Sequence, residues 1–271
     1  MEQTLYLVLE NGKIFKGKSF GACGEAVGEV VFTTGMTGYL ETLTDRSYYG
    51  QIVVQTFPLI GNAGVIPPDF ESAGPAIQAY IVRQWCREPS NFRSEGCLDT
   101  FLKENNIIGL YDIDTRALTK IIREAGVMNG IITTDPENVD VWKLKSYRIE
   151  HAVDAVTCRE KREYPSKGRC KVALLDFGAK ENIIRCLNER GCDVTSYPAE
   201  TPAEVLLADK SDGIMLSNGP GDPQENTAVI REIKKLVASQ VPMFGICLGH
   251  QLLALANGGK TVKLKYGHRG G

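Results

Sequence analysis

In the second half of the chain, short apolar runs alternate with segments whose apolar residues recur every three or four positions. Such runs are typical of buried strands, and such periodic segments are typical of amphipathic helices. The expected strands are KVALLDF (171–177), CDVTSYP (192–198), DGIMLSN (212–218) and VPMFGIC (241–247). The expected helices are AKENIIRCLNERG (179–191), TPAEVLLADK (201–210), NTAVIREIKKLVAS (226–239) and LGHQLLALANGG (248–259). This alternation predicts right-handed βαβ units and a parallel sheet with helices on both faces.

The first half has a different pattern, rich in β-type runs with a few helical segments. The runs LYLVLE (5–10) and KIFKGK (13–18) flank Asn11-Gly12, which predicts a hairpin with a two-residue I′ turn. Further strands are expected at GEVVFTT (28–34), QIVVQTF (51–57) and NGIITT (129–134), and helices at CLDTFLKENN (97–106) and DTRALTKIIREAG (114–126). Asp114 or Thr115 is expected to cap the second helix at its start, and Gly126 to end it.

Between the two patterns lies a charged stretch with little periodic apolar signal that ends in Pro-Ser-Lys-Gly. Its latter part is typical of an inter-domain connector. We therefore expect an amino-terminal domain over residues 1–150, a linker over 151–168 and a second domain over 169–271. The predicted fold class is α/β, with a mixed β/α domain followed by a doubly wound, mostly parallel α/β domain.

Composition narrows the class of protein. The 271 residues are 43% hydrophobic, enough for a substantial core, and the net charge is −2 with acidic and basic residues dispersed. Neither a nucleic-acid surface nor a membrane-binding face is indicated, and no apolar run is long enough to span a membrane. The first residues lack the features of a signal peptide. The eight cysteines are scattered, with no C-x-x-C pair, so we expect reduced thiols, no metal site and a cytoplasmic protein.

The most informative motif is Gly245-Ile246-Cys247-Leu248-Gly249. It has the form G-x-C-x-G, the thiol counterpart of the G-x-S-x-G nucleophile elbow, and it falls between an expected strand and an expected helix. Small flanking residues let strand and helix pack closely, and the helix amides favour a thiolate. The motif therefore predicts that Cys247 is a nucleophile and that the N–H of Leu248 faces an oxyanion.

A second loop, SNGPGDP (217–223), also follows an expected strand. The carboxyl ends of parallel strands are where sites form, and its exposed amides suit an oxyanion or a carboxylate. A general base is harder to identify. His250 shares the first helical turn with Cys247, and neither His151, in the linker, nor His268, in a Gly-rich segment, is a convincing partner.

Taken together, the segments DFGAKENIIR, LSNGPGDP and FGICLGHQLLALANGGKTVKLKYGHRGG resemble the class I (triad) glutamine amidotransferase domain. The form is that of the small subunit of carbamoyl-phosphate synthase. The front half is similar to the amino-terminal domain of that subunit, notably in GEVVFTTGMTGYLETLTDRSYYGQIVVQTFPLIGN, PSNFR and DIDTRALTKIIREAG. The resemblance spans nearly the whole chain.

The resemblance implies hydrolysis of L-glutamine and delivery of the ammonia to a large synthetase subunit. That partner would use ATP, Mg and bicarbonate to make carbamoyl phosphate for arginine and pyrimidine synthesis, while this subunit would need no cofactor. By position, Cys247 matches the nucleophile, and Gly219 and Leu248 match the oxyanion hole. The residues that match the glutamine-binding positions are Ser47, Gly219, Gly221, Leu248 and Gln251.

The family continues beyond the GHRGG segment to an Asn-Gly-Phe-type stretch and then to the catalytic histidine and glutamate. The resemblance thus leads us to expect a carboxyl-terminally truncated chain with little glutaminase activity and an open sheet edge. Two alternatives remain. One is the amidotransferase component of another biosynthetic complex, against which the front domain argues. The other is a non-catalytic subunit that docks on the synthetase and regulates it.

Overall fold

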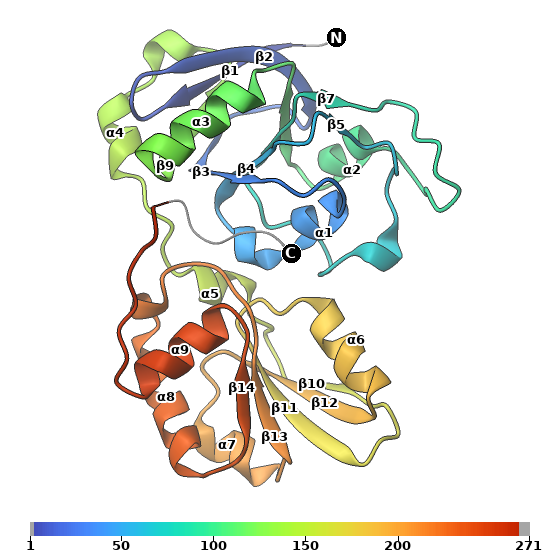
Figure 1. The fold of residues 1–271 in the computed structure, drawn as a ribbon, viewed down its shortest axis with the longest axis vertical. Coiled ribbons are helices and arrows are strands. Elements are labelled where there is room, and N and C mark those ends of the chain that lie inside the picture. The colour runs from blue at the N-terminus through green and yellow to red at the C-terminus, as the bar shows by residue number, and fades with distance from the viewer. Residues whose placement is uncertain (1–2, 266–271) are drawn as a thin grey trace. The chain divides into compact units, whose positions relative to one another are not determined.

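The computed structural model describes residues 3–265, which form two compact units (Figure 1). The described residues of the first unit fall within Met1–Thr44, Gly50–Ile149 and Lys263–Gly271, and the second unit contains Asp45–Tyr49 and Glu150–Val262. Each unit is therefore assembled from segments that are separated in the sequence. The short segment Asp45–Tyr49 belongs to the second unit although the chain on both sides of it belongs to the first.

The first unit is built on a closed β-barrel with the strand order β1-β2-β8-β6-β4-β3-β9. Its strands are β1 (Thr4–Leu9), β2 (Ile14–Gly21), β3 (Ala26–Thr33), β4 (Gln51–Gln55), β6 (Ala79–Ile81), β8 (Ile108–Tyr111) and β9 (Met128–Thr133). The helices are α1 (Tyr39–Thr44), α2 (Leu98–Glu104), α3 (Thr115–Ala125) and α4 (Val141–Ser146), and β5 (Leu59–Ile60) pairs with β7 (Gln84–Trp85). Alternating apolar residues of the strands, together with Leu118 and Ile122 of α3, form one buried core.

Two local predictions for this unit can be compared with the structure. Asp114 is the residue that caps α3, since its carboxylate accepts the N–H of Ala117 at 2.9 Å, and Gly126 ends the helix with φ of 103°. The hairpin between β1 and β2 is present, but the predicted two-residue I′ turn is wrong. Leu9 and Lys13 are bonded across a three-residue loop in which Gly12 alone has positive φ, the geometry of a turn closed by a bulge.

The second unit is a five-stranded sheet of order β10-β12-β11-β13-β14. Its strands are β10 (Arg162–Tyr164), β11 (Cys170–Asp176), β12 (Cys192–Pro198), β13 (Gly213–Leu216) and β14 (Met243–Gly245), and β10 alone runs antiparallel to its neighbour. The helices are α5 (Ala152–Val156), α6 (Glu181–Glu189), α7 (Ala203–Ala208), α8 (Thr227–Ala238) and α9 (Leu248–Ala256).

Both faces of this sheet carry helices, which the side-chain alternation along β11 explains. Ala173 and Leu175 pack with apolar residues of α7, α8 and α9, whereas Leu174, between them, packs with Ile184 of α6 (Figure 1). The α/β class and the doubly wound, mostly parallel arrangement predicted from the alternating pattern are confirmed.

Residues 151–168, which were expected to form a linker, are part of the second unit in the structure. They contribute α5 and the edge strand β10 to the second unit, and Val153 of α5 joins the core of that unit. The sequence signal was weak because β10 is three residues long, two of them exposed, and α5 has little more than one turn. In the described part of the chain, no helix has the length and apolar content to cross a membrane.

Candidate active site

The sequence motif at the end of β14 forms a tight strand-to-helix elbow. Cys247 is the residue that precedes α9, its backbone has φ of 51° and ψ of −110°, and its side chain is exposed. A non-glycine residue in this region carries strain on the order of 1–3 kcal/mol. Three backbone bonds maintain the conformation: Ile246 N–H to Leu216 O, Gly249 N–H to Ser217 O, each 3.0 Å, and Gln251 N–H to Cys247 O at 3.1 Å.

The two glycines of the motif are required by close packing. A Cβ on Gly245 would lie 2.6 Å from the backbone nitrogen of His250, and one on Gly249 would lie 2.3 Å from the carbonyl oxygen of Leu216. Neither glycine has positive φ, so lack of space is the reason for both. The strand, the elbow and the first turn of α9 therefore approach one another as closely as their backbones permit.

The loop after β13 lies against this elbow. Gly219 is buried, and a Cβ there would meet the Phe177 carbonyl oxygen at 2.2 Å and Cδ2 of Leu248 at 2.8 Å. The Leu248 side chain is also buried, so it links the loop to the elbow. Within residues 3–265, no hydrogen bond uses the N–H of Gly219 or that of Leu248. Unpaired buried N–H groups are uncommon, and two of them beside an exposed thiol are suited to donate hydrogen bonds to an oxyanion.

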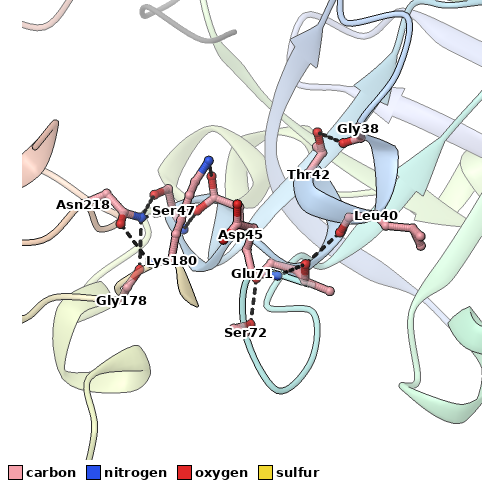
Figure 2. A network of polar contacts seen from close by, with 11 residues as sticks. Gly38, Leu40, Thr42, Asp45, Ser47, Glu71, Ser72, Gly178, Lys180 and Asn218 are labelled. Carbon is pink, nitrogen blue, oxygen red and sulfur yellow. Dashed lines mark hydrogen bonds and ion pairs between the residues drawn. The ribbon is translucent and has the colours of Figure 1, made fainter. Parts of the chain in front are cut away.

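Ser47 reaches this loop through the side chain of Asn218 (Figure 2). The Asn218 amide nitrogen donates to the Ser47 hydroxyl at 2.9 Å and to the Gly178 carbonyl at 3.0 Å, and its oxygen accepts the Lys180 N–H at 3.0 Å. Asn218 is 3% exposed, so its bonding geometry is fixed by the protein. Because the amide donates to the Ser47 oxygen, the Ser47 hydroxyl hydrogen is left to point at another acceptor.

The segment that carries Ser47 is fixed by charge and capping. Asp45 accepts the N–H of Ser47 at 2.8 Å, and its carboxylate lies 3.0 Å from the ammonium of Lys180 (Figure 2). The guanidinium of Arg46 donates to the carbonyl of Val156 at 2.7 Å. These bonds hold Asp45–Tyr49 against the loops at the carboxyl ends of β11 and β13.

The remaining two predicted site residues are more exposed. Gln251 lies on the first turn of α9. Gly221 has φ of +85° and lines a cavity of about 480 Å³ between α5 and the start of α8. In the described part of the chain, the Gln251 side chain has no hydrogen bond to Ser47 or Cys247.

No histidine is placed as a base for Cys247 among the residues that the structure describes. His250 is exposed on α9, and His151 has a left-handed backbone conformation, with Nδ1 3.5 Å from a carboxylate oxygen of Asp154. His268 lies outside the described residues. No group of three His, Cys, Asp or Glu residues within 3–265 is arranged to hold a metal ion.

Reasoning from residue types did not single out Ser47 or the residues around it, Asp45, Gly178 and Lys180, and Ser47 was proposed from the resemblance alone. A lone serine in a loop carries no signal, and Asp45 is distant from the loop in sequence. The one available signal was the Asx-type cap Asp45-Arg46-Ser47, which indicates an ordered turn but no function. Asn218 was visible as part of SNGPGDP, although its bond to Ser47 was not.

The fold and this elbow define a class I glutamine amidotransferase domain. The family model for that class, "Glutamine amidotransferase class-I", matches residues 173–271, and "Carbamoyl-phosphate synthase small chain, CPSase domain" matches residues 7–132. The chain belongs to the carbamoyl phosphate synthase small chain family.

Three relatives document the similarity. The carbamoyl phosphate synthase small chain of Clostridium perfringens is 53% identical, over 97% of this chain and 76% of that protein. The small chain of Syntrophotalea carbinolica is 49% identical, over 98% and 75%. The pyrimidine-specific small chain of Bacillus subtilis is 50% identical, over 97% and 73%. The chain thus spans about three quarters of the length of these relatives.

Proposed function

We propose that this chain hydrolyses L-glutamine as the amidotransferase subunit of a carbamoyl-phosphate synthase. The observation that carries the proposal is the pair of unpaired N–H groups, on Gly219 and Leu248, beside the exposed, strained Cys247. The Cys247 sulfur would attack the carboxamide carbon of glutamine, and the developing oxyanion would accept both N–H groups. Expulsion of ammonia leaves a glutamyl thioester, which water hydrolyses to glutamate and the free thiol.

In this proposal the glutamine is bound by Ser47, Gly219, Gly221, Leu248 and Gln251. The Ser47 hydroxyl acts as a hydrogen-bond donor, because the Asn218 amide already donates to its oxygen. The α-carboxylate of glutamine is an acceptor of the kind that such a donor recognises. The backbone amides of the SNGPGDP loop would complete the cradle.

Departure of ammonia requires a proton, which a general acid normally supplies. Since no described histidine is placed beside Cys247, we expect the 271-residue polypeptide to turn over glutamine slowly. General acid–base catalysis contributes about 10² to 10⁴ in rate. Attack by the thiol and formation of the thioester are the steps that the described residues support.

The ammonia would be passed to a separate large subunit, which would use ATP, Mg and bicarbonate to form carbamoyl phosphate. The proposed setting is a cytoplasmic heterodimer that serves arginine and pyrimidine synthesis. The name of the Bacillus subtilis relative refers to pyrimidine-specific use, which supports that half of the proposal. No cofactor is proposed for this subunit itself.

The test is labelling of Cys247 by a glutamine-like chloroketone, combined with measurement of ammonia release from glutamine. We expect rapid, glutamine-protected labelling that disappears in Cys247→Ser and persists in Cys186→Ser, a half-buried thiol on α6. Labelling no faster than that of Cys186 would contradict a glutaminase site. Ammonia release at the rate typical of enzymes, about 10 s⁻¹, would contradict the expected slow turnover.

A second candidate is a non-catalytic subunit that docks on the synthetase and regulates it. The observation that favours it is the absence, among the described residues, of a histidine in contact with Cys247. Purification with a large synthetase subunit, without labelling of Cys247, would support docking over catalysis.

A further inference from the structure

Two cysteines that the proposed reaction does not use are paired across the sheet of the second unit. Cys170 begins β11 and Cys192 begins β12, and the two residues are direct partners in the parallel register of these strands. Partners on adjacent strands have Cα atoms about 4.7–4.9 Å apart, and their side chains point to the same face. A disulfide requires a Cα separation of about 4.4–6.8 Å, so the register itself satisfies this condition.

The side chains of the pair lie on the same face of the sheet, as partners in register do. Both residues are partly exposed at the amino ends of their strands. Burial raises the pKa of the Cys170 thiol, and the neighbouring Cys192 raises this pKa further. The pair is therefore a resident dithiol that an oxidant can reach from solvent and that reacts more readily as the pH rises.

The backbone around the pair is held closely. Gly168 precedes Cys170 by two positions, and a Cβ on it would lie 1.7 Å from the carbonyl oxygen of Gly191. The backbone segments at Gly168 and Gly191 are therefore in van der Waals contact. Asp193 accepts both the N–H and the hydroxyl of Ser166, at 2.6 and 3.1 Å. The segment just before Cys170 is thus fixed against the residues on either side of Cys192, so little chain entropy opposes a bond between the two cysteines.

We propose that Cys170 and Cys192 form a reversible disulfide, through exchange with a low-molecular-weight disulfide such as oxidised glutathione. The Cys170 thiolate attacks one sulfur of the oxidant, forms a mixed disulfide and expels one glutathione thiolate. The Cys192 thiolate then attacks the Cys170 sulfur and expels the second glutathione. Both protein thiols lose their protons to solvent, and the oxidant gains the two electrons and leaves as two glutathiones.

The disulfide would lie at the opposite end of the strands from the candidate active site. The site loops follow the carboxyl ends of β11, β13 and β14, whereas Cys170 and Cys192 are the first residues of β11 and β12. Oxidation would therefore cross-link the sheet without changing the elbow. Partial exposure of the pair makes the bond accessible to reductants, so it would open again in excess thiol.

The experiment is a redox titration of the full 271-residue chain in buffers of fixed reduced-to-oxidised glutathione ratio, followed by alkylation and peptide mass mapping. We expect loss of the mass of two hydrogens, one cross-linked peptide pair containing Cys170 and Cys192, and recovery of both thiols on transfer to reducing buffer. Neither Cys170→Ser nor Cys192→Ser should form the cross-link, whereas Cys186→Ser, on the adjacent helix, should form it as the wild type does.

A second readout separates a preformed pair from accidental oxidation. The oxidised wild type should melt about 5–10 °C above the reduced protein, because the cross-link restricts the unfolded chain. Its Cys247 labelling rate should be unchanged. A cross-link between other cysteines, a reaction that stops at glutathione adducts, or a fall in melting temperature on oxidation would each overturn the proposal.

Discussion

The side-chain amide of Asn218 donates a hydrogen bond of 2.9 Å to the hydroxyl of Ser47, across 171 positions of sequence. The same amide nitrogen donates to Gly178, and the amide oxygen accepts from Lys180. Because both the nitrogen and the oxygen of this buried amide are hydrogen-bonded, the side chain is held in one orientation and acts as a clamp on Ser47. It fixes the Ser47 oxygen and sets the direction in which its hydrogen can be donated.

Replacement of Asn218 by Asp should impair substrate recognition while leaving Cys247 in place. The carboxylate has nearly the same shape but cannot donate to Ser47, which would then have to donate to the carboxylate instead of to the ligand. We expect the labelling rate of Cys247 by a glutamine-like chloroketone to fall about tenfold, as for loss of one hydrogen bond to a charged group. Labelling by iodoacetamide, which needs no recognition, should change little.

The matched control is Asn257→Ala, because Asn257 is exposed and its amide bonds only locally, to the carbonyl of Leu253 at 2.8 Å. That variant should keep both labelling rates. If Asn218→Asp left the ratio of chloroketone labelling to iodoacetamide labelling unchanged, recognition by Ser47 would not depend on its hydrogen bond from Asn218.

Replacement of Gly219 by Ala should destabilise the second unit and misplace the N–H expected to bind the oxyanion. The new Cβ would meet a backbone oxygen at 2.2 Å, so the loop must move. We expect the free energy of unfolding to fall by about 1–3 kcal/mol and chloroketone labelling to slow more than iodoacetamide labelling. Gly213→Ala, at a position where the nearest atom to a Cβ is 3.5 Å away, is the control and should unfold like the wild type.

The backbone strain at Cys247 predicts a trade-off between stability and reactivity. Glycine adopts positive φ at little cost, so Cys247→Gly should raise the free energy of unfolding by roughly 1 kcal/mol while abolishing labelling. Cys186→Gly, inside α6, should instead lower it by about 0.5–1 kcal/mol. Urea unfolding of both variants tests this contrast. An equal change in the free energy of unfolding for the two variants would show that the backbone at Cys247 is not strained.

The carboxylate of Asp193 should contribute to the acid sensitivity of the fold. Hydrogen bonds from the Ser166 backbone and then its hydroxyl lower the pKa of Asp193 below its ordinary value. Its contribution is therefore complete above an unfolded-state pKa of about 3.9 and is lost as the pH falls through the lower folded-state value. The difference in unfolding free energy between wild type and Asp193→Asn should be constant above about pH 5 and shrink below about pH 4.

The edge of the sheet at β14 predicts self-association. Among the described residues, β14 pairs with β13 alone, and the Phe244 side chain on it is 64% exposed. An apolar strand with an unpaired edge is a template for another chain. Phe244→Lys should reduce the concentration-dependent growth of particle size measured by light scattering. Val205→Lys, which removes an exposed apolar residue from helix α7 instead of an edge strand, is the control and should associate as the wild type does.

Periodicity predicted most of the second unit well because its apolar strands alternate along the chain with amphipathic helices. The elbow at Cys247 followed from the same logic, since two glycines around a thiol at a strand end imply tight packing. By contrast, the barrel of the first unit depends on pairings such as β3 with β4 and β2 with β8, which are set by tertiary register and leave no mark on local sequence. The clamp on Ser47 was invisible for the same reason, since its partners are brought together by the fold.

Because Asp45–Tyr49 belongs to the second unit, that unit cannot be isolated as one continuous fragment of the chain. A fragment that starts near residue 150 would contain the whole sheet and the elbow but lack the segment that Asn218 and Lys180 bind. During synthesis that segment leaves the ribosome long before Lys180 and Asn218, so its contacts with them form only after the second unit has been made. Asn218 and Lys180 therefore find Ser47 and Asp45 only when the front half is present with the second unit, as one polypeptide or as a fragment added back.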